Sequence, residues 1–79
     1  MDTYQQLQEA ISQTLQVPPE RVTPTSKAGE LAAWDSLGHV NLMISLEQTF
    51  DIQLELEDFE NLASVPAILS YLKARGIGR

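Results

Sequence analysis

Apolar residues recur every three or four positions along three stretches of this chain, and this period most constrains what it can fold into. The first stretch has four apolar residues on one helical face: Tyr4, Leu7, Ile11 and Leu15. Such a stripe, with polar residues between its members, is typical of an amphipathic helix. It predicts a helix over residues 3–15, with Thr3 or Asp2 as its cap. Pro18 and Pro19 end it, because neither ring supplies a backbone donor.

The second stretch is the most strongly helical segment of the sequence. It has a broad apolar face, made of Leu37, Val40, Leu42, Met43, Leu46 and Phe50. We expect a helix over residues 36–50, with Asp35 or Ser36 accepting hydrogen bonds from its first amides. One of Met43 and Ile44 should line the core, and the other should face outward as an apolar contact.

The third stripe predicts the last helix. Its inward-facing residues are Val65, Ile68, Leu69 and Leu72. Ser64 is the expected cap, and Pro66 is tolerated in the first turn. Lys73 and Arg75 lie in the last turn, where cations favour the negative helix end, and Gly76 suits the position after it.

The connection between the first two helices is long for so small a protein. It covers residues 16–35, and Val22 and Leu31 are its expected anchors in the core. Loops of this length are uncommon unless they are functional or cross between distant helix ends. A short helical turn near residues 28–33 would break up this one.

Between the second and last helices, Ile52, Leu54 and Leu56 alternate with polar residues. By period alone this alternation indicates a strand, but nothing else in the sequence pairs with it, and a lone strand is not stable. We therefore expect an extended connection into a short third helix near residues 58–62. The predicted fold class is all-α, with three longer helices, one short third helix and a long first loop.

Length and composition limit what this fold can do. A chain of 79 residues has room for one domain, residues 1–79, with one core. With no cysteine and a single histidine, we expect no disulfide and no metal site. These features suit the reducing cytoplasm, and we identify neither a signal peptide nor an apolar run long enough to span a bilayer.

The charge of the chain is strongly uneven. No Lys or Arg occurs between Lys27 and Lys73, and this interval holds eight acidic residues: Glu30, Asp35, Glu47, Asp51, Glu55, Glu57, Asp58 and Glu60. Such a field repels the phosphates of nucleic acids and of anionic lipids and attracts basic protein surfaces. The expected partners are therefore proteins, and not nucleic acid or membrane.

The most informative motif runs from Trp34 to His39, where the long loop meets the central helix. A helix N-terminus presents free amides and a partial positive charge, so Ser36 is placed to carry a phosphate group. An Asp-Ser pair here can also be a plain helix cap. A hydrolytic triad of Asp35, Ser36 and His39 is disfavoured, because neighbours within one turn rarely reach the required geometry. We therefore assign no catalytic residue from this motif.

The segment Asp35-Ser36-Leu37 resembles the D-S-L motif of acyl carrier proteins, in which 4'-phosphopantetheine esterifies the serine. The residues from Val40 to Ile52 are similar to the second helix of that family and its exit, and Ser64-Val65 with the stripe to Leu72 is similar to its last helix. The resemblance covers essentially the whole chain. It implies a small four-helix bundle of acyl-carrier type and a carrier in place of an enzyme.

The resemblance also implies partners and cargo. A phosphopantetheinyl transferase would move the arm from coenzyme A to Ser36, and the thiol of the arm would hold an acyl group as a thioester. Acyl-loading and acyl-transferring enzymes would be the further partners of a monomeric carrier, in fatty acid, polyketide or other specialised biosynthesis. Two alternatives stay open: an aminoacyl carrier of the peptidyl or D-alanyl type, and a helical interaction module without an arm.

Roles for the neighbours of Ser36 follow from the same resemblance. Asp35 would orient the loop or the coenzyme A held by the transferase, and Leu37 would pack at the partner interface. His39 is expected to be a solvated helix residue whose functional role is a contact to the phosphate of the arm. Trp34 is either a core anchor, which we favour, or a partner contact. The predicted partner-binding residues are Trp34, Leu37, Ile44, Glu47, Glu55, Glu57 and Asp58.

The predicted second helix departs from fatty-acid-synthesis carriers, in which it is strongly acidic. Its polar positions here are Gly38, His39, Asn41, Gln48 and Thr49, which leaves Glu47 as its only charge. The chain in this respect looks more like discrete carriers of specialised pathways, such as those of secondary metabolites or surface glycans. Gly38 either weakens the first helical turn or permits the close approach of an enzyme.

Overall fold

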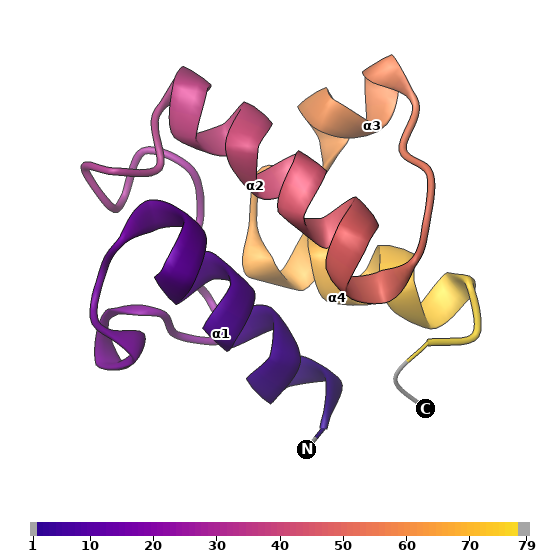
Figure 1. Cartoon of the computed structure of the whole chain (residues 1–79), viewed down its shortest axis with the longest axis horizontal. Helices are drawn as coiled ribbons and strands as arrows, with labels where there is room; N and C mark the ends of the chain where they lie inside the picture. Colours follow the sequence, from indigo (N-terminus) through magenta and orange to yellow (C-terminus); the bar gives the residue numbers. More distant parts are fainter. Residues whose placement is uncertain (1, 78–79) are drawn as a thin grey trace.

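Helices account for all the regular secondary structure in residues 2–77, the part of the chain that this computed structural model describes (Figure 1). The elements are α1 (Thr3–Leu15), the short 3₁₀ helix η1 (Pro19–Arg21), α2 (Ser36–Phe50), α3 (Leu56–Asn61) and α4 (Val65–Ala74). The extended segment after α2 forms no strand within this range, and only isolated bridges occur. The all-α prediction of three longer helices and a short third helix is confirmed.

Local capping signals set the ends of the longer helices. The Asp2 carboxylate accepts a hydrogen bond from the Gln5 amide at 2.7 Å, and Ser64 Oγ accepts one from the Ala67 amide at 3.2 Å. A residue in the left-handed conformation ends α2, namely Asp51 with φ of 54°. These signals lie within a few residues of the helix ends, which is why the sequence located them closely.

Helix α3 begins earlier than expected, at Leu56 in place of residue 58. The Asp58 carboxylate accepts a hydrogen bond from the Glu55 amide at 2.9 Å, and Glu55 caps in return, so the two form a capping box. This reciprocal pair makes Asp58 the third helical residue. As a consequence Leu56 lies on the outside of the first turn and is 84% exposed.

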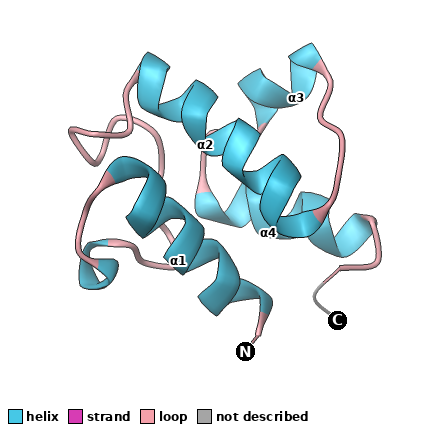
Figure 2. Ribbon diagram, in the orientation of Figure 1, coloured by secondary structure: helices cyan, strands magenta, loops and turns pink. Residues whose placement is uncertain are grey.

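One core joins the four helices. α1 and α2 run antiparallel and side by side, with α3 next to α2 (Figures 1 and 2). The buried apolar residues are Leu7, Ala10, Ile11, Leu15, Val22, Trp34, Leu42, Met43, Leu46, Leu62, Val65, Ile68 and Leu72. Among the described residues, no helix is long and apolar enough to cross a membrane.

The predicted inner face of α2 was partly wrong. Leu42, Met43 and Leu46 are buried as expected, but Leu37 is 72% exposed and Val40 is 42% exposed. The apolar residues of α2 go almost all the way round the helix, so periodicity alone could not orient it. The packing of α1 against one side of α2 makes that choice.

The long connection, residues 16–35, is tied down by backbone hydrogen bonds. The Ala28 amide donates to the Ala63 carbonyl and the Val65 amide to the Ser26 carbonyl, both at 2.8 Å. These bonds fasten the middle of the loop to the start of α4. Residues 28–33 form tight turns in place of the expected helical turn. The loop therefore gains its order from distant partners and needs no helix of its own.

Val22 anchors the first half of this loop to α1, as predicted. Its side chain is buried, and its carbonyl accepts hydrogen bonds from the Tyr4 hydroxyl and the Gln8 side-chain amide, both at 3.1 Å. Desolvation by burial raises the pKa of the Tyr4 hydroxyl. These contacts fix the path of the loop toward the N-terminus of α2.

Candidate functional site

The candidate site is the first turn of α2 together with the loop residues that precede it. Asp35 is the N-cap: its Oδ1 accepts from the Gly38 amide at 2.8 Å, and its carbonyl accepts from the His39 amide at 2.8 Å. Ser36 is therefore the first residue of the helix, and its side chain is exposed. The amides of Ser36 and Leu37 have no acceptor within the helix, as at every helix N-terminus. A phosphate on the Ser36 hydroxyl would lie at the positive end of the helix dipole.

Gly38 allows the loop to pass close to this first turn. A Cβ at position 38 would collide with the Ala33 carbonyl oxygen and would lie 3.0 Å from Leu15 Cδ2. The glycine therefore permits close approach by the protein's own backbone. The sequence had suggested two other roles for Gly38, namely that it weakens the first helical turn or that it lets an enzyme approach. The absence of a side chain at this position lets the loop lie against the first turn of α2.

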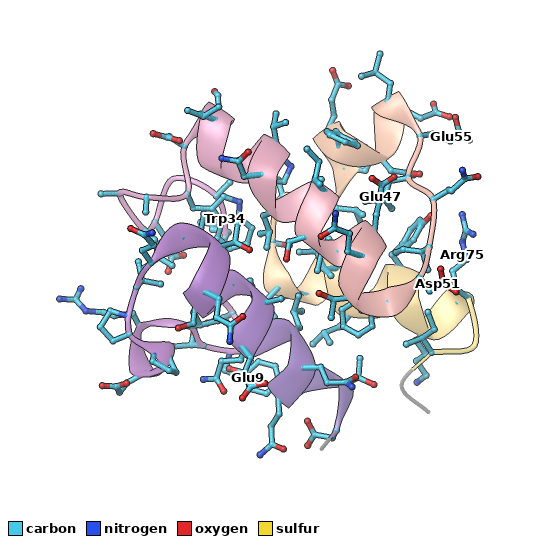
Figure 3. The ribbon with its side chains drawn as sticks, viewed as in Figure 1. Glu9, Trp34, Glu47, Asp51, Glu55 and Arg75 are labelled. Carbon is cyan, nitrogen blue, oxygen red and sulfur yellow. The ribbon has the colours of Figure 1, made fainter. Side chains whose placement is uncertain are left out.

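Trp34 and His39 form a hydrogen-bonded pair next to Ser36. The Trp34 Nε1–H donates to His39 Nδ1 at 2.9 Å, and the two rings stack with centroids 6.2 Å apart. Trp34 is only 1% exposed, so it is the favoured core anchor and not a surface contact for a partner (Figure 3). Because Nδ1 accepts, Nε2 carries the proton and donates to the Phe59 carbonyl on α3.

These contacts correct the expectation for His39. The side chain is half-buried and hydrogen-bonded through both ring nitrogens, so it is not a solvated helix residue. A contact to the phosphate of an arm would require one of these two bonds to open. The same bonds leave the disfavoured triad unassembled, since His39 faces Trp34 and Phe59 while Asp35 caps the helix.

A shallow hollow of about 360 Å³ opens beside Ser36. It lies between the long loop and the first turn of α2, and it is lined by Ala28, Gly29, Trp34, Asp35, Ser36 and His39. The serine hydroxyl is thus accessible to a second protein and has open space next to it. Both conditions fit a site at which another enzyme attaches a group.

Beyond Ser36, α2 presents an uncharged apolar face. Leu37, Val40 and Ile44 are exposed at spacings of three and four, so they share one side of the helix. Glu47, the one charge of α2, is half-buried and accepts a hydrogen bond from the Leu54 amide at 2.9 Å (Figure 3). Its carboxylate holds the connection to α3 in place.

The sequence pattern predicted Val40 on the buried face of the helix, although its spacing from two predicted surface residues indicates that it is exposed. It lies three positions after Leu37 and four before Ile44, both of which were predicted to contact partners. Residues with these spacings share one helical face, so an outward Leu37 and Ile44 require an outward Val40.

The predicted acidic residues at the start of α3 differ in exposure. Glu55 and Glu57 are exposed around Leu56, and with Glu60 they line a second open hollow of about 360 Å³. Asp58 is half-buried, and its carboxylate caps the helix. The exposed part of this cluster is therefore an apolar side chain within an acidic rim.

Comparison with known proteins agrees with this arrangement. A family model described as a phosphopantetheine attachment site matches residues 5–72. The chain is 33% identical over 72 residues to an acyl carrier protein of Cylindrotheca sp. (strain N1), covering 91% of this chain and 90% of that protein. It is 33% identical over 73 residues to that of Wolinella succinogenes, covering 92% and 96% of the two chains. A third acyl carrier protein, from Helicobacter hepaticus, is 31% identical over 74 residues, covering 94% and 97%.

Proposed function

Because this chain belongs to the acyl carrier protein family, whose members carry 4'-phosphopantetheine, we propose that Ser36 is the residue to which its arm is attached. The chain functions as a carrier and not as a catalyst. When bound, the arm supplies a thiol that holds an acyl group as a thioester. The protein itself supplies the attachment point and the surfaces that partner enzymes recognise.

The observation that carries this assignment is the position of Ser36 at the start of α2. Its hydroxyl is exposed beside an open hollow, while the Asp35 carboxylate is engaged with the Gly38 amide. The free amides and the dipole of the helix favour the negative charge that a phosphodiester on this oxygen would bring. The base that activates the hydroxyl belongs to the transferase, since the side chain of His39 is occupied by Trp34 and Phe59.

We further propose that the exposed apolar residues of α2, namely Leu37, Val40 and Ile44, form the surface that the phosphopantetheinyl transferase and the acyl-handling enzymes contact. They begin next to Ser36 and lie on one side of the helix, so a partner that reaches the arm would cover them. Glu55 and Glu57 would add an acidic margin. Leu37 would be central because it is the most exposed of the three.

We propose that this carrier is a monomer and that it works in the cytoplasm. It would consist of one domain over residues 1–79. The absence of cysteine from the chain suits a reducing compartment. The uncharged outer face of α2 favours service in a specialised pathway, because partners with strongly basic docking surfaces would find little charge there.

The test is intact-mass spectrometry of the protein after incubation with coenzyme A and a broad-specificity phosphopantetheinyl transferase. We expect the wild-type protein to gain the mass of one arm and Ser36→Ala to gain none. Ser70→Ala, an exposed serine of α4, is the matched control and should be loaded like the wild type. An unmodified wild-type protein, or a Ser36→Ala variant that still gains the arm, would refute the assignment.

A further inference from the structure

Hydrogen bonds join α2 to the long loop and to α3 about one helical turn after Ser36. Three residues from three parts of the chain meet there: Trp34 from the long loop, His39 from α2 and Phe59 from α3. The Trp34 indole donates to one nitrogen of the His39 ring, and the other nitrogen donates to the Phe59 carbonyl. We call these contacts the Trp34–His39–Phe59 bridge.

The bridge requires the neutral form of His39 with the proton on Nε2. Only this form can accept from Trp34 and donate to Phe59 at the same time, because each ring nitrogen has one role. Trp34 is 1% exposed, so its indole N–H would be left buried without a partner if His39 moved away. An unpaired buried donor is costly, and this cost holds the bridge closed.

Side chains of the two helices that the bridge joins are packed as part of the core. The ring of Phe59 is half-buried against the core cluster, and Met43 and Leu46 of α2 are almost fully buried. An alkyl chain that entered between α2 and α3 from Ser36 would have to break both hydrogen bonds of the bridge. It would also have to displace the Phe59 ring from close-packed neighbours, which tolerate added volume poorly.

From this geometry, and resting on the proposed attachment at Ser36, we propose that the protein keeps its cargo outside the helical core. An apolar chain held in water loses the burial that stabilises it, and this loss grows with every methylene. A short or polar acyl group, an amino acid included, suffers little from exposure. We therefore assign short or polar acyl groups to this carrier as its cargo. Long alkyl chains are excluded from its interior.

The test compares arms that carry acetyl, hexanoyl or dodecanoyl groups. Stable amide analogues of the corresponding acyl-coenzyme A molecules are transferred to the full-length wild-type protein, and intact mass confirms each product. Trp34 is the only tryptophan, so its indole N–H gives a single NMR signal that reports on the bridge. We expect this signal to keep its position for all three cargoes and the melting temperatures to agree within about 2 °C.

Two variants should create dependence on chain length. His39→Ala removes both hydrogen bonds of the bridge, whereas Phe59→Ala keeps the carbonyl and removes the ring that an entering chain would have to displace. In each variant the dodecanoyl form should melt at least about 4 °C above the acetyl form, because the chain can then bury methylenes. Asn41→Ala, an exposed residue of α2 outside the bridge, is the matched control and should behave like the wild type.

Two wild-type results would overturn the proposal without any need for the variants. One is a shift of the Trp34 indole signal on dodecanoyl loading, and the other is a melting temperature that rises with chain length. Hydrolysis of true thioesters provides a check, since a buried dodecanoyl thioester would hydrolyse at least about tenfold more slowly than the acetyl form. Failure of Ser36 to gain any arm is a separate result, seen by mass before the cargo is compared, and it would refute the attachment site itself.

Discussion

At the scale of single residues, two positions beside Ser36 act through contacts that their residue types alone do not reveal. Gly38 lets the Ala33 carbonyl lie against the first turn of α2, and His39 uses both ring nitrogens to join the long loop to α3. The hydrogen bonds of the His39 ring go to Trp34 and Phe59. Gly38 and His39 both hold in place the backbone from which Ser36 extends.

Gly38→Ala should therefore destabilise the protein, although alanine is the better helix former by about 1 kcal/mol. The added Cβ would collide with a backbone oxygen, which cannot move as a flexible side chain can, and overpacking of this kind costs about 1–3 kcal/mol. We expect a lower midpoint of urea denaturation. Thr49→Ala, exposed on the same helix, should change the midpoint little, and a Gly38→Ala protein more stable than wild type would contradict the close contact.

At the scale of the elements, the N-terminus of α2 combines a structural and a functional role. Asp35 is the cap of the helix and also the first residue of the motif that resembles those of acyl carrier proteins. The hydrogen bond to the Gly38 amide needs only an oxygen acceptor, whereas a role in guiding the transferase would need the negative charge. A substitution that keeps the oxygen acceptor but removes the charge can separate the capping role of Asp35 from a role in guiding the transferase.

Asp35→Ala should cost about 1 kcal/mol of folding stability through loss of the cap, whereas Asp35→Asn should cost little, because asparagine caps nearly as well. Urea denaturation measures this difference. The rate of arm transfer then reports on the charge: we expect Asp35→Asn to be loaded several-fold more slowly than wild type at equal stability. If Asp35→Asn were loaded as fast as the wild type, the role of Asp35 would be that of a helix cap alone.

At the scale of the whole molecule, the net charge of −6 acts on a small body. The structure measures 30 × 28 × 20 Å along its principal axes. At an ionic strength of 0.01 M the Debye length is about 30 Å, so every charge interacts with every other, while at 1 M it falls to about 3 Å. Repulsion among the acidic residues between Lys27 and Lys73 therefore opposes folding mainly at low salt.

The melting temperature should rise with ionic strength, and divalent cations should raise it further at equal ionic strength. If salt relieves about 1 kcal/mol of repulsion, the melting temperature of a domain of this size should rise by about 4–8 °C. Circular dichroism melts in dilute buffer with and without sodium chloride measure the effect. A melting curve that is the same at low and high salt would show that the acidic residues repel one another too weakly to matter.

Sequence reasoning located α1 and α2 closely and placed α4 within a residue of its observed end, because the helical period and the caps are local signals. It also located the motif around Ser36, since three adjacent residues carry it. It placed α3 two residues late, because the capping box of Glu55 and Asp58 competes with the more obvious start at Asp58.

The sequence by itself determined the all-α class, the position of the central helix and the residue proposed to carry the arm. Only the tertiary structure decided which side of α2 faces solvent, why residue 38 is glycine and what His39 binds. The physical reason is that the partners lie elsewhere in the chain. The His39 ring binds a carbonyl twenty residues away, and a Cβ at position 38 would collide with the Ala33 carbonyl of the long loop and press on Leu15 of α1. Contacts of this kind exist only once the helices have packed, and no local pattern records them.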